Sequence, residues 1–329
     1  MNNPTLPLVL ISHTLPDGWL NLLKGRCQVI SGPQDANNFS SELRAHLPQA
    51  DGLITLLTIK VDEDLLSQAA NIKVVSNMAV GFDNIDVAAC TKREIPVGNT
   101  PGVLTEGTAD LTMAILLAAA RRLFEANQDA RNGKWETWSP TGWLGKDLNG
   151  ATLGIVGMGQ IGSAVAERAR GFGMDIIYSD PNPNKENTEK LGSKHVSFEQ
   201  LLKESDFISL HIPLTPHTHH MINEDQLKMM KPTALLINTS RGPIINQDAL
   251  IKGLREDWIA GAALDVTDPE PLPPEHPLFN LPNCLIVPHI GSATWNTRRN
   301  MAERACLNML AGLEGQRLPY CVNPEVYNQ

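Results

Sequence analysis

Several features that define other classes of protein are scarce in this sequence. Acidic residues outnumber basic ones by 36 to 27 and no basic cluster stands out, which argues against a nucleic-acid-binding protein. No run of about 18 or more apolar residues suggests a membrane span, and residues 1–4 lack the basic region of a secretory or transit signal. The five cysteines form no CxxC pair, so we expect reduced cytoplasmic thiols rather than a disulfide or zinc framework.

The most informative feature that is present is a GxGxxG turn that directly follows an apolar, strand-like stretch and leads into helix-forming sequence. In such a turn Gly157 permits the sharp bend, Gly159 lets the backbone approach a pyrophosphate, and Gly162 lets the helix pack on the strand. A second apolar stretch, 174–179, ends at Asp180, whose carboxylate can accept hydrogen bonds from ribose hydroxyls. The segment therefore predicts a dinucleotide site.

Apolar stretches of strand length recur along the chain, and they are continuous rather than alternating, as expected for strands buried on both faces. Helical patterns connect them, so right-handed crossovers and a parallel sheet follow. Helices are predicted over 104–122 and 296–313, and the second should pack back onto the N-terminal part. The predicted strands are 8–11, 27–30, 52–56 and 73–76 in a shorter first set, and 152–156, 175–179, 207–210, 234–238, 261–264 and 284–287 in the second.

This rhythm predicts an α/β fold with two doubly wound domains. Residues 102–294 are expected to form a dinucleotide-binding domain of the Rossmann type. Residues 1–101 and 295–329 are expected to form a smaller, discontinuous substrate domain. Because ligand pockets are common between lobes, the active site is expected between the two domains.

Three charged or titratable residues follow successive predicted strands, where ligands collect in such folds. Arg241 could bind a substrate carboxylate through its guanidinium fork and polarise the neighbouring carbonyl. His289 could transfer a proton, and the carboxylate of Glu270, fixed between two prolines, could set the tautomer of its ring. Taken one at a time, these residues could equally be structural; their combination favours hydride transfer to a 2-oxo acid.

Other catalytic classes find less support. His217, His219 and His220 lack a carboxylate or cysteine partner at metal-site spacing, so no metal site is predicted. No GxSxG elbow is present, and no cysteine lies in a nucleophile motif.

The chain resembles the D-isomer-specific 2-hydroxyacid dehydrogenase family. Within this family it is most similar to the glyoxylate/hydroxypyruvate reductases. The resemblance covers nearly the whole chain. The segments that carry it are 77–86, 101–110, GMGQIG, 211–216, NTSRG, DVTDPEPLP and PHIGSAT.

The resemblance implies roles for individual residues. Arg241, Glu270 and His289 would be catalytic, with Arg241 on the substrate carboxylate, His289 as acid/base and Glu270 as its partner. The smaller domain would have a flavodoxin-like fold. Substrate contacts are implied for Leu56, Val80, Gly81, Arg241, His289 and Ser292. Cofactor contacts are implied for Thr105, Gly157, Gly159, Gln160, Ile161, Gly162, Asp180, Pro213, Thr218, Thr239, Ser240, Arg241, Asp265, His289 and Gly291.

The resemblance also bears on the cofactor and on assembly. Related reductases that prefer NADP often carry an arginine just after the second strand, whereas this chain has Asp180 and no arginine there, which favours NAD; Lys185 leaves room for NADP. Family members are typically homodimers. Residues 127–148 carry Trp135, Trp138 and Trp143 and are expected to form the dimer contact, with a self-packing loop as the alternative.

The resulting hypothesis is an NAD-dependent oxidoreductase that converts glyoxylate or hydroxypyruvate to glycolate or D-glycerate. Leu56 and Leu57 would limit the space beyond the carbonyl, with no basic group for a phosphate. The alternatives are a dehydrogenase for D-lactate, D-glycerate or phosphoglycerate, and a non-catalytic dinucleotide sensor like the corepressors of similar fold.

Overall fold

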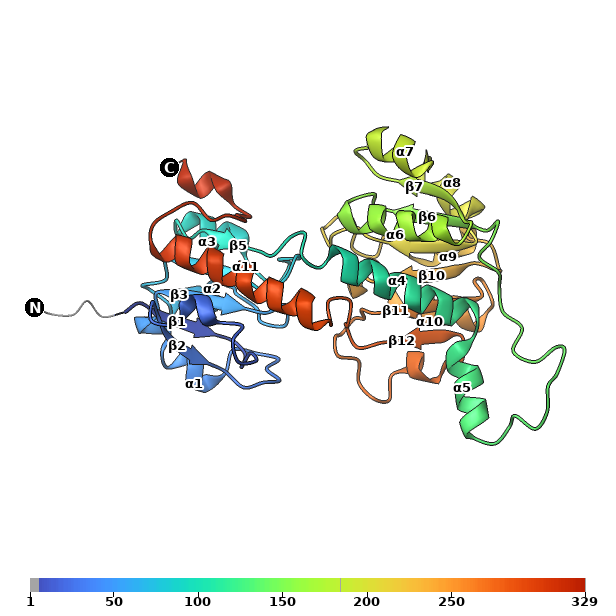
Figure 1. Ribbon diagram of the computed structural model, residues 1–329, viewed down its shortest axis with the longest axis horizontal. Coiled ribbons are helices and arrows are strands. Elements are labelled where there is room, and N and C mark those ends of the chain that lie inside the picture. Colours follow the sequence, from blue (N-terminus) through green and yellow to red (C-terminus); the bar gives the residue numbers. More distant parts are fainter. Residues whose placement is uncertain (1–5, 184, 329) are drawn as a thin grey trace, which may run out of the picture. The chain divides into compact units, whose positions relative to one another are not determined.

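The computed structural model describes residues 6–183 and 185–328 (Figure 1). The chain divides into two compact units: unit 1, Met1–Leu104 with Thr294–Gln329, and unit 2, Thr105–Ala293. The sequence predicted the divisions after residues 101 and 294. Both units contain parallel sheets covered by helices, so the predicted α/β fold with two doubly wound domains is confirmed.

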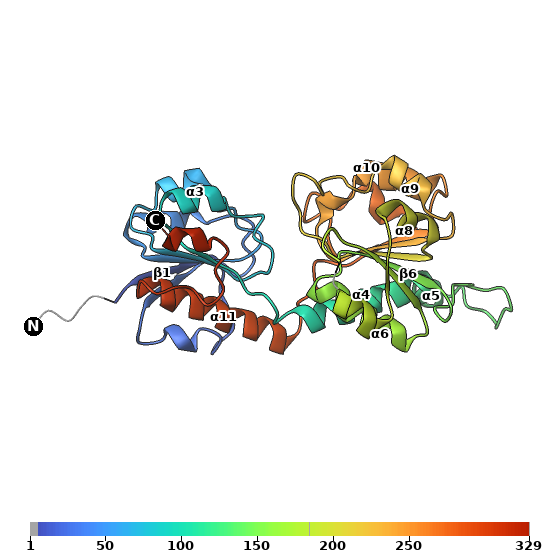
Figure 2. The same cartoon turned by 90° about the horizontal axis from the view of Figure 1, so that it is seen from above.

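Unit 1 is built on a five-stranded sheet in the order β2-β1-β3-β4-β5. Helix α3 lies on one face of it and α11 on the other (Figure 2). Gly312 of α11 packs so closely that an added Cβ would lie 2.5 Å from the Cβ of Val74, which is why the helix can approach the sheet there. The elements are β1 Leu8–Ile11, β2 Gln28–Ser31, α1 Ser41–Arg44, β3 Gly52–Thr55, α2 Glu63–Ser67, β4 Val74–Asn77, α3 Val87–Lys92, β5 Val97–Gly98 and α11 Trp295–Leu313.

Unit 2 is built on a seven-stranded sheet in the order β12-β11-β10-β9-β6-β7-β8. Its elements are α4 Thr105–Ala120, α5 Leu123–Arg131, β6 Thr152–Val156, α6 Gln160–Gly171, β7 Asp175–Ser179, α7 Lys185–Leu191, β8 Lys194–His195, α8 Phe198–Glu204, β9 Phe207–Leu210, α9 Glu224–Met229, β10 Leu235–Asn238, α10 Gln247–Arg255, β11 Gly261–Leu264 and β12 Cys284–Ile286.

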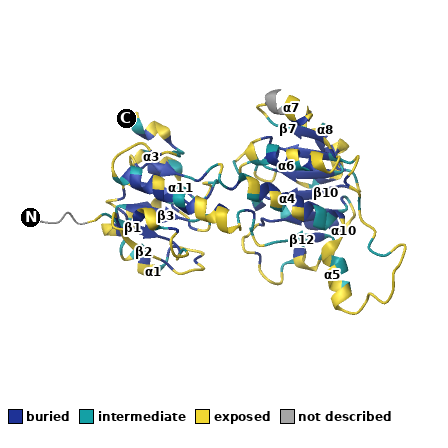
Figure 3. Ribbon diagram, viewed as in Figure 1, coloured by how far each residue is buried: buried dark blue, intermediate teal, exposed yellow. Residues whose placement is uncertain are grey.

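Two apolar cores sandwich the sheet of unit 2. Helices α4 and α6 cover one face, and α8, α9 and α10 cover the other (Figure 2). Within β9, Phe207 belongs to the first core, whereas Ile208 and Leu210 belong to the second. Neighbouring residues of a strand point to opposite faces, so a strand with two covered faces is mostly apolar on both of them. The central strands β9, β10 and β11 are accordingly buried along their length (Figure 3).

The strand order of unit 2 reverses at β6, which pairs with β9 on one side and β7 on the other. In open parallel sheets, ligands bind outside the carboxyl ends of the strands at such a switch point. The turn that follows β6 is the GxGxxG turn, so topology and sequence motif indicate the same place.

Three elements differ from the sequence-based prediction. The helix expected over 104–122 ends at Ala120, because Arg122 adopts a left-handed conformation with φ +50° and a new helix, α5, begins at Leu123. The strands β5 and β8 were not predicted. Each has two residues, too short for a hydrophobic pattern, and β8 is an exposed edge strand.

Candidate active site

The three glycines of the turn after β6 are required for different reasons. Gly157 has φ +93°, and an added Cβ there would lie 2.8 Å from the carbonyl oxygen of His211. At Gly162 an added Cβ would lie 2.1 Å from the carbonyl oxygen of Gly157, so only glycine lets α6 pack this closely. At Gly159, by contrast, an added Cβ would meet nothing within 4 Å. The open side of the turn, beside the N-terminus of α6, fits a dinucleotide pyrophosphate.

Asp180 follows β7 and is fixed against this turn. Its Oδ2 accepts a hydrogen bond from the Met158 N–H at 2.9 Å, and its Oδ1 accepts one from the Asn182 N–H at 2.8 Å. Each carboxylate oxygen has two acceptor sites, so the residue keeps capacity for ribose hydroxyls. The contact with Met158 was not predicted, because nothing in residue spacing shows it. Lys185, by contrast, lies at the start of α7 and its side chain falls outside the described residues.

His289 and Glu270 form a hydrogen-bonded pair in unit 2. His289 Nδ1 bonds to Glu270 Oε1, and the second carboxylate oxygen accepts the Thr267 N–H at 3.3 Å. Both side chains are partly exposed. With Nδ1 engaged by the carboxylate, Nε2 is the nitrogen available for a substrate. The structure brings this predicted pair together.

Arg241 lies in a tight turn after β10. The side chain of Asn238 shapes the turn: its Oδ1 accepts the Ser240 N–H at 3.0 Å and its Nδ2 donates to the Arg241 carbonyl at 2.8 Å. Arg241 itself donates from Nη1 to the Ser240 carbonyl at 2.8 Å. Since β10, β11 and β12 are adjacent, Arg241, Glu270 and His289 follow the carboxyl ends of neighbouring parallel strands.

The other predicted cofactor residues also lie in unit 2, on loops and helix starts at the same edge. Thr105 and Gln160, which begin α4 and α6, are joined by a 3.4 Å hydrogen bond. Thr239 is buried and its hydroxyl lies 2.9 Å from that of Thr112. The rest of this set are Ile161, Pro213, Thr218, Ser240, Asp265 and Gly291.

The predicted substrate residues are divided between the units: Ser292 belongs to unit 2, and Leu56, Val80 and Gly81 belong to unit 1. In unit 1, Asn99 donates to the Val80 carbonyl at 2.8 Å and Asn77 to the Gly81 carbonyl at 2.9 Å. The N–H groups of Val80 and Gly81 have no hydrogen-bond acceptor among the described residues.

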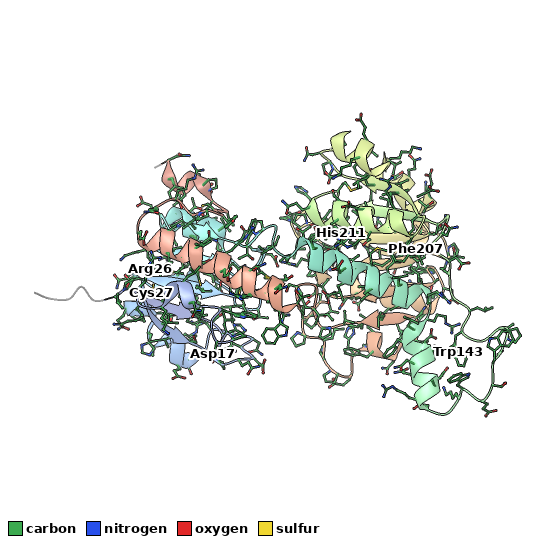
Figure 4. All side chains as sticks on the ribbon, in the orientation of Figure 1. Asp17, Arg26, Cys27, Trp143, Phe207 and His211 are labelled. Atoms are coloured by element: carbon green, nitrogen blue, oxygen red, sulfur yellow. The ribbon has the colours of Figure 1, made fainter. Side chains whose placement is uncertain are left out.

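His211 is a site-edge residue to which the sequence assigned no role. It directly follows β9 and is labelled in Figure 4. Its carbonyl faces Gly157, and its ring bonds to the Ser209 hydroxyl at 2.8 Å. Burial lowers the pKa of His211 to about 4, so its ring is neutral at physiological pH. The HIPLT segment was the signal that could have marked it.

The described chain, 6–183 and 185–328, holds no candidate metal centre and no helix suited to span a membrane. No group of three or more histidine, cysteine or acidic side chains is placed to hold a metal ion. No helix combines the length and apolarity that a bilayer crossing needs.

The chain is similar to known proteins of one family. A model described as D-isomer specific 2-hydroxyacid dehydrogenase, NAD binding domain, matches residues 113–291. The glyoxylate reductase of Thermococcus litoralis is 48% identical over 324 residues, which cover 97% of this chain and 98% of that protein. The solved TT0316 protein of Thermus thermophilus is 46% identical, with a TM-score of 0.89 and coverage of 96% and 99%.

A further solved structure is the NADPH-dependent glyoxylate/hydroxypyruvate reductase of Sinorhizobium meliloti in complex with NADP and malonate. It is 31% identical, with a TM-score of 0.85, and the alignment covers 97% of this chain and 98% of that one. Together with a domain match over more than half of the chain, these relatives show that the protein belongs to the D-isomer specific 2-hydroxyacid dehydrogenase family and is an oxidoreductase that acts on CH–OH donors.

Proposed function

We propose that this enzyme reduces glyoxylate and hydroxypyruvate to their D-2-hydroxy acids, with NADH as the preferred cofactor. The observation that carries the proposal is the His289–Glu270 pair, which follows strands at the edge of the sheet where the glycine turn and Arg241 also lie. The similarity to curated glyoxylate reductases over nearly the full chain supports the choice of substrate.

The chemistry assigned to each residue follows from its group. Arg241 binds the substrate carboxylate through two parallel N–H donors and stabilises charge that develops on the neighbouring oxygen. His289, protonated on Nε2, donates its proton to that oxygen as general acid, while Glu270 holds the ring through Nδ1. When bound, the cofactor supplies the hydride that adds to the carbonyl carbon.

The preference for NADH rests on Asp180. Its carboxylate lies beside the glycine turn, where the ribose of the adenosine half is expected, and it would repel a 2′-phosphate. The similar Sinorhizobium meliloti enzyme is NADPH-dependent, so the preference is tested by comparing kcat/KM for NADH and NADPH.

For the substrate we assign a carboxylate contact to the N–H groups of Val80 and Gly81, in addition to Arg241. The carbonyl groups of Val80 and Gly81 accept hydrogen bonds from asparagine side chains, which fixes this backbone. The two N–H groups have no acceptor among the described residues, so they can donate to an anion. Leu56 and Leu57 then limit the space beyond the carbonyl, and Ser292 is a further substrate contact. An apolar end offers nothing to pair with a phosphate or a second carboxylate, whose unpaired burial costs several kcal/mol.

We also propose a homodimer in the cytoplasm. Trp135 and Trp138 are 65% and 80% exposed on the segment between α5 and β6, and a cavity of 640 Å³ lies at the amino-terminal edge of the sheet in unit 2, lined in part by Phe124 and Leu144. Large exposed apolar side chains of this kind mark interaction surfaces. All five cysteines are free, as expected in a reducing compartment.

A turnover assay with the purified protein tests the proposed function. NADH consumption is followed with glyoxylate, hydroxypyruvate, pyruvate, oxaloacetate and phosphohydroxypyruvate, and kcat/KM is compared. We expect the first two to be used well, pyruvate about one to two orders of magnitude less well, and the last two hardly at all. If kcat/KM were highest for pyruvate, the enzyme would be reassigned as a D-lactate dehydrogenase. If none of the acids were reduced, a dinucleotide sensor would be favoured.

A further inference from the structure

Asp265 is a buried carboxylate directly after β11, and only 2% of its surface is exposed. A buried carboxylate is costly unless hydrogen-bond donors satisfy it. Its Oδ1 accepts the Ile290 N–H at 2.6 Å and its Oδ2 accepts the Gly291 N–H at 2.8 Å. Its backbone carbonyl accepts the His289 N–H at 2.9 Å. Three consecutive N–H groups of the segment that carries His289 therefore donate to one residue.

The segment that Asp265 holds has an unfavourable backbone conformation. His289 has φ +49°, in the left-handed region that residues other than glycine rarely adopt. Such a conformation persists only where surrounding contacts determine it. Two residues further along, Gly291 also lies close to Asp265, because an added Cβ there would be 3.1 Å from Asp265 Oδ2.

The ring of His289 is held separately. Its Nδ1 bonds to Glu270, which belongs to a different loop, whereas the bonds to Asp265 hold its backbone. Glu270 thus orients the imidazole ring, and Asp265 fixes the position of the His289 backbone that carries the ring. A displacement of about 1 Å in a reacting group can cost about 100-fold in rate, so both supports matter.

We propose that Asp265 is a positioning residue for the reaction. Its carboxylate, through the N–H groups of Ile290 and Gly291, holds the left-handed turn that places His289. This inference rests on the proposed function, in which His289 is the proton donor. It is separate from the expected cofactor contact of Asp265: both side-chain oxygens accept a backbone N–H group, and each keeps a second acceptor site.

The test is Asp265→Asn, which keeps the size of the side chain but replaces one acceptor oxygen by an NH₂ group that faces an N–H group. We expect kcat with glyoxylate to fall about 10- to 100-fold, while the Kd for NADH, measured by fluorescence titration, changes less than about threefold. The matched control is Asp268→Asn: Asp268 is exposed, lies three residues further along, and its carboxylate accepts no hydrogen bond from any described residue. The control should keep wild-type kcat.

Gly291→Ala tests the same contact without removing the carboxylate. The new methyl group forces a shift of a few tenths of an ångström at Asp265 Oδ2, so kcat should fall as it does in Asp265→Asn. This variant replaces Asp265→Asn in the test if Asp265→Asn does not fold. A kcat within about threefold of wild type in a folded Asp265→Asn, or a loss of NADH affinity as large as the loss of kcat, would overturn the proposal. A wild-type enzyme without turnover would instead contradict the proposed function.

Discussion

At the level of single residues, the site separates chemistry from support. In the proposed mechanism His289, Glu270 and Arg241 carry the reacting and binding groups. Arg241 and His289 each lie on a loop whose backbone another side chain holds. Asn238 shapes the turn of Arg241, and Asp265 holds the turn of His289. The loops therefore carry function while buried polar groups at strand ends fix their geometry.

The role of His289 gives the first prediction. His289→Gln keeps a similar size but removes the ionisable proton, so we expect kcat with glyoxylate to fall by about two to four orders of magnitude, with NADH still bound. His46→Gln, a partly exposed histidine of unit 1, is the control and should keep wild-type activity. If His289→Gln retained more than about a tenth of wild-type kcat, another group would have to be the proton donor.

The cofactor preference belongs to the same scale. Asp180→Ser combined with Pro181→Arg removes a repulsive charge and supplies a phosphate partner, so the ratio of kcat/KM for NADPH to that for NADH should rise about 10- to 100-fold. Asp175→Ser, at the opposite end of β7, is the control and should leave the ratio unchanged. A wild-type enzyme with higher kcat/KM for NADPH would show that Asp180 does not set the preference.

At the level of elements, the contact between β6 and α6 determines the shape of the glycine turn. Gly162→Ala would place a methyl group 2.1 Å from the Gly157 carbonyl oxygen, and backbone has to move to relieve that contact. We expect the free energy of unfolding to fall by about 1–3 kcal/mol and the Kd for NADH to rise at least about tenfold, because the turn and the N-terminus of α6 move together.

The control for this prediction lies in the same helix. An added Cβ at Gly171 meets nothing within 4 Å, so Gly171→Ala should be neutral or stabilise by up to about 1 kcal/mol through the better helix propensity of alanine. Thermal denaturation and NADH titration of both variants decide the matter. Equal behaviour of the two would mean that the close packing at Gly162 is not needed.

The sequence predicts these elements unevenly. Strands with two covered faces, such as β11, appear as continuous apolar runs, and glycines at a turn have a fixed spacing, so both can be recognised locally. The bonds from Ile290 and Gly291 to Asp265, 25 and 26 residues away, cannot, because spacing does not show which distant groups meet. The break at Arg122 was missed too, since arginine rarely adopts the left-handed conformation found there.

At the scale of the whole molecule, the segment between α5 and β6 is exposed or half-buried up to residue 147, and Leu148 then enters the core beneath α4 and α6. Part of it packs on its own unit: Trp143, labelled in Figure 4, donates from Nε1 to Asp129 of α5 at 3.0 Å. The self-packing alternative therefore holds for this one tryptophan. Trp135 and Trp138 remain 65% and 80% exposed, and unit 2 has other exposed apolar side chains nearby in sequence, Leu123, Phe124 and Leu144.

The homodimer proposal makes this segment the contact, and the mass of the protein tests it. Light scattering during gel filtration should give twice the chain mass of 35.9 kDa for the wild type. Replacing Trp135 and Trp138 together by serine removes two large apolar surfaces, so the dimer should weaken by at least about 2 kcal/mol and dissociate at lower protein concentration. Trp295→Ser is the matched control, because Trp295 is 78% exposed but belongs to unit 1. A wild type at the mass of one chain, or equal weakening by the control, would remove residues 127–148 as the dimer contact.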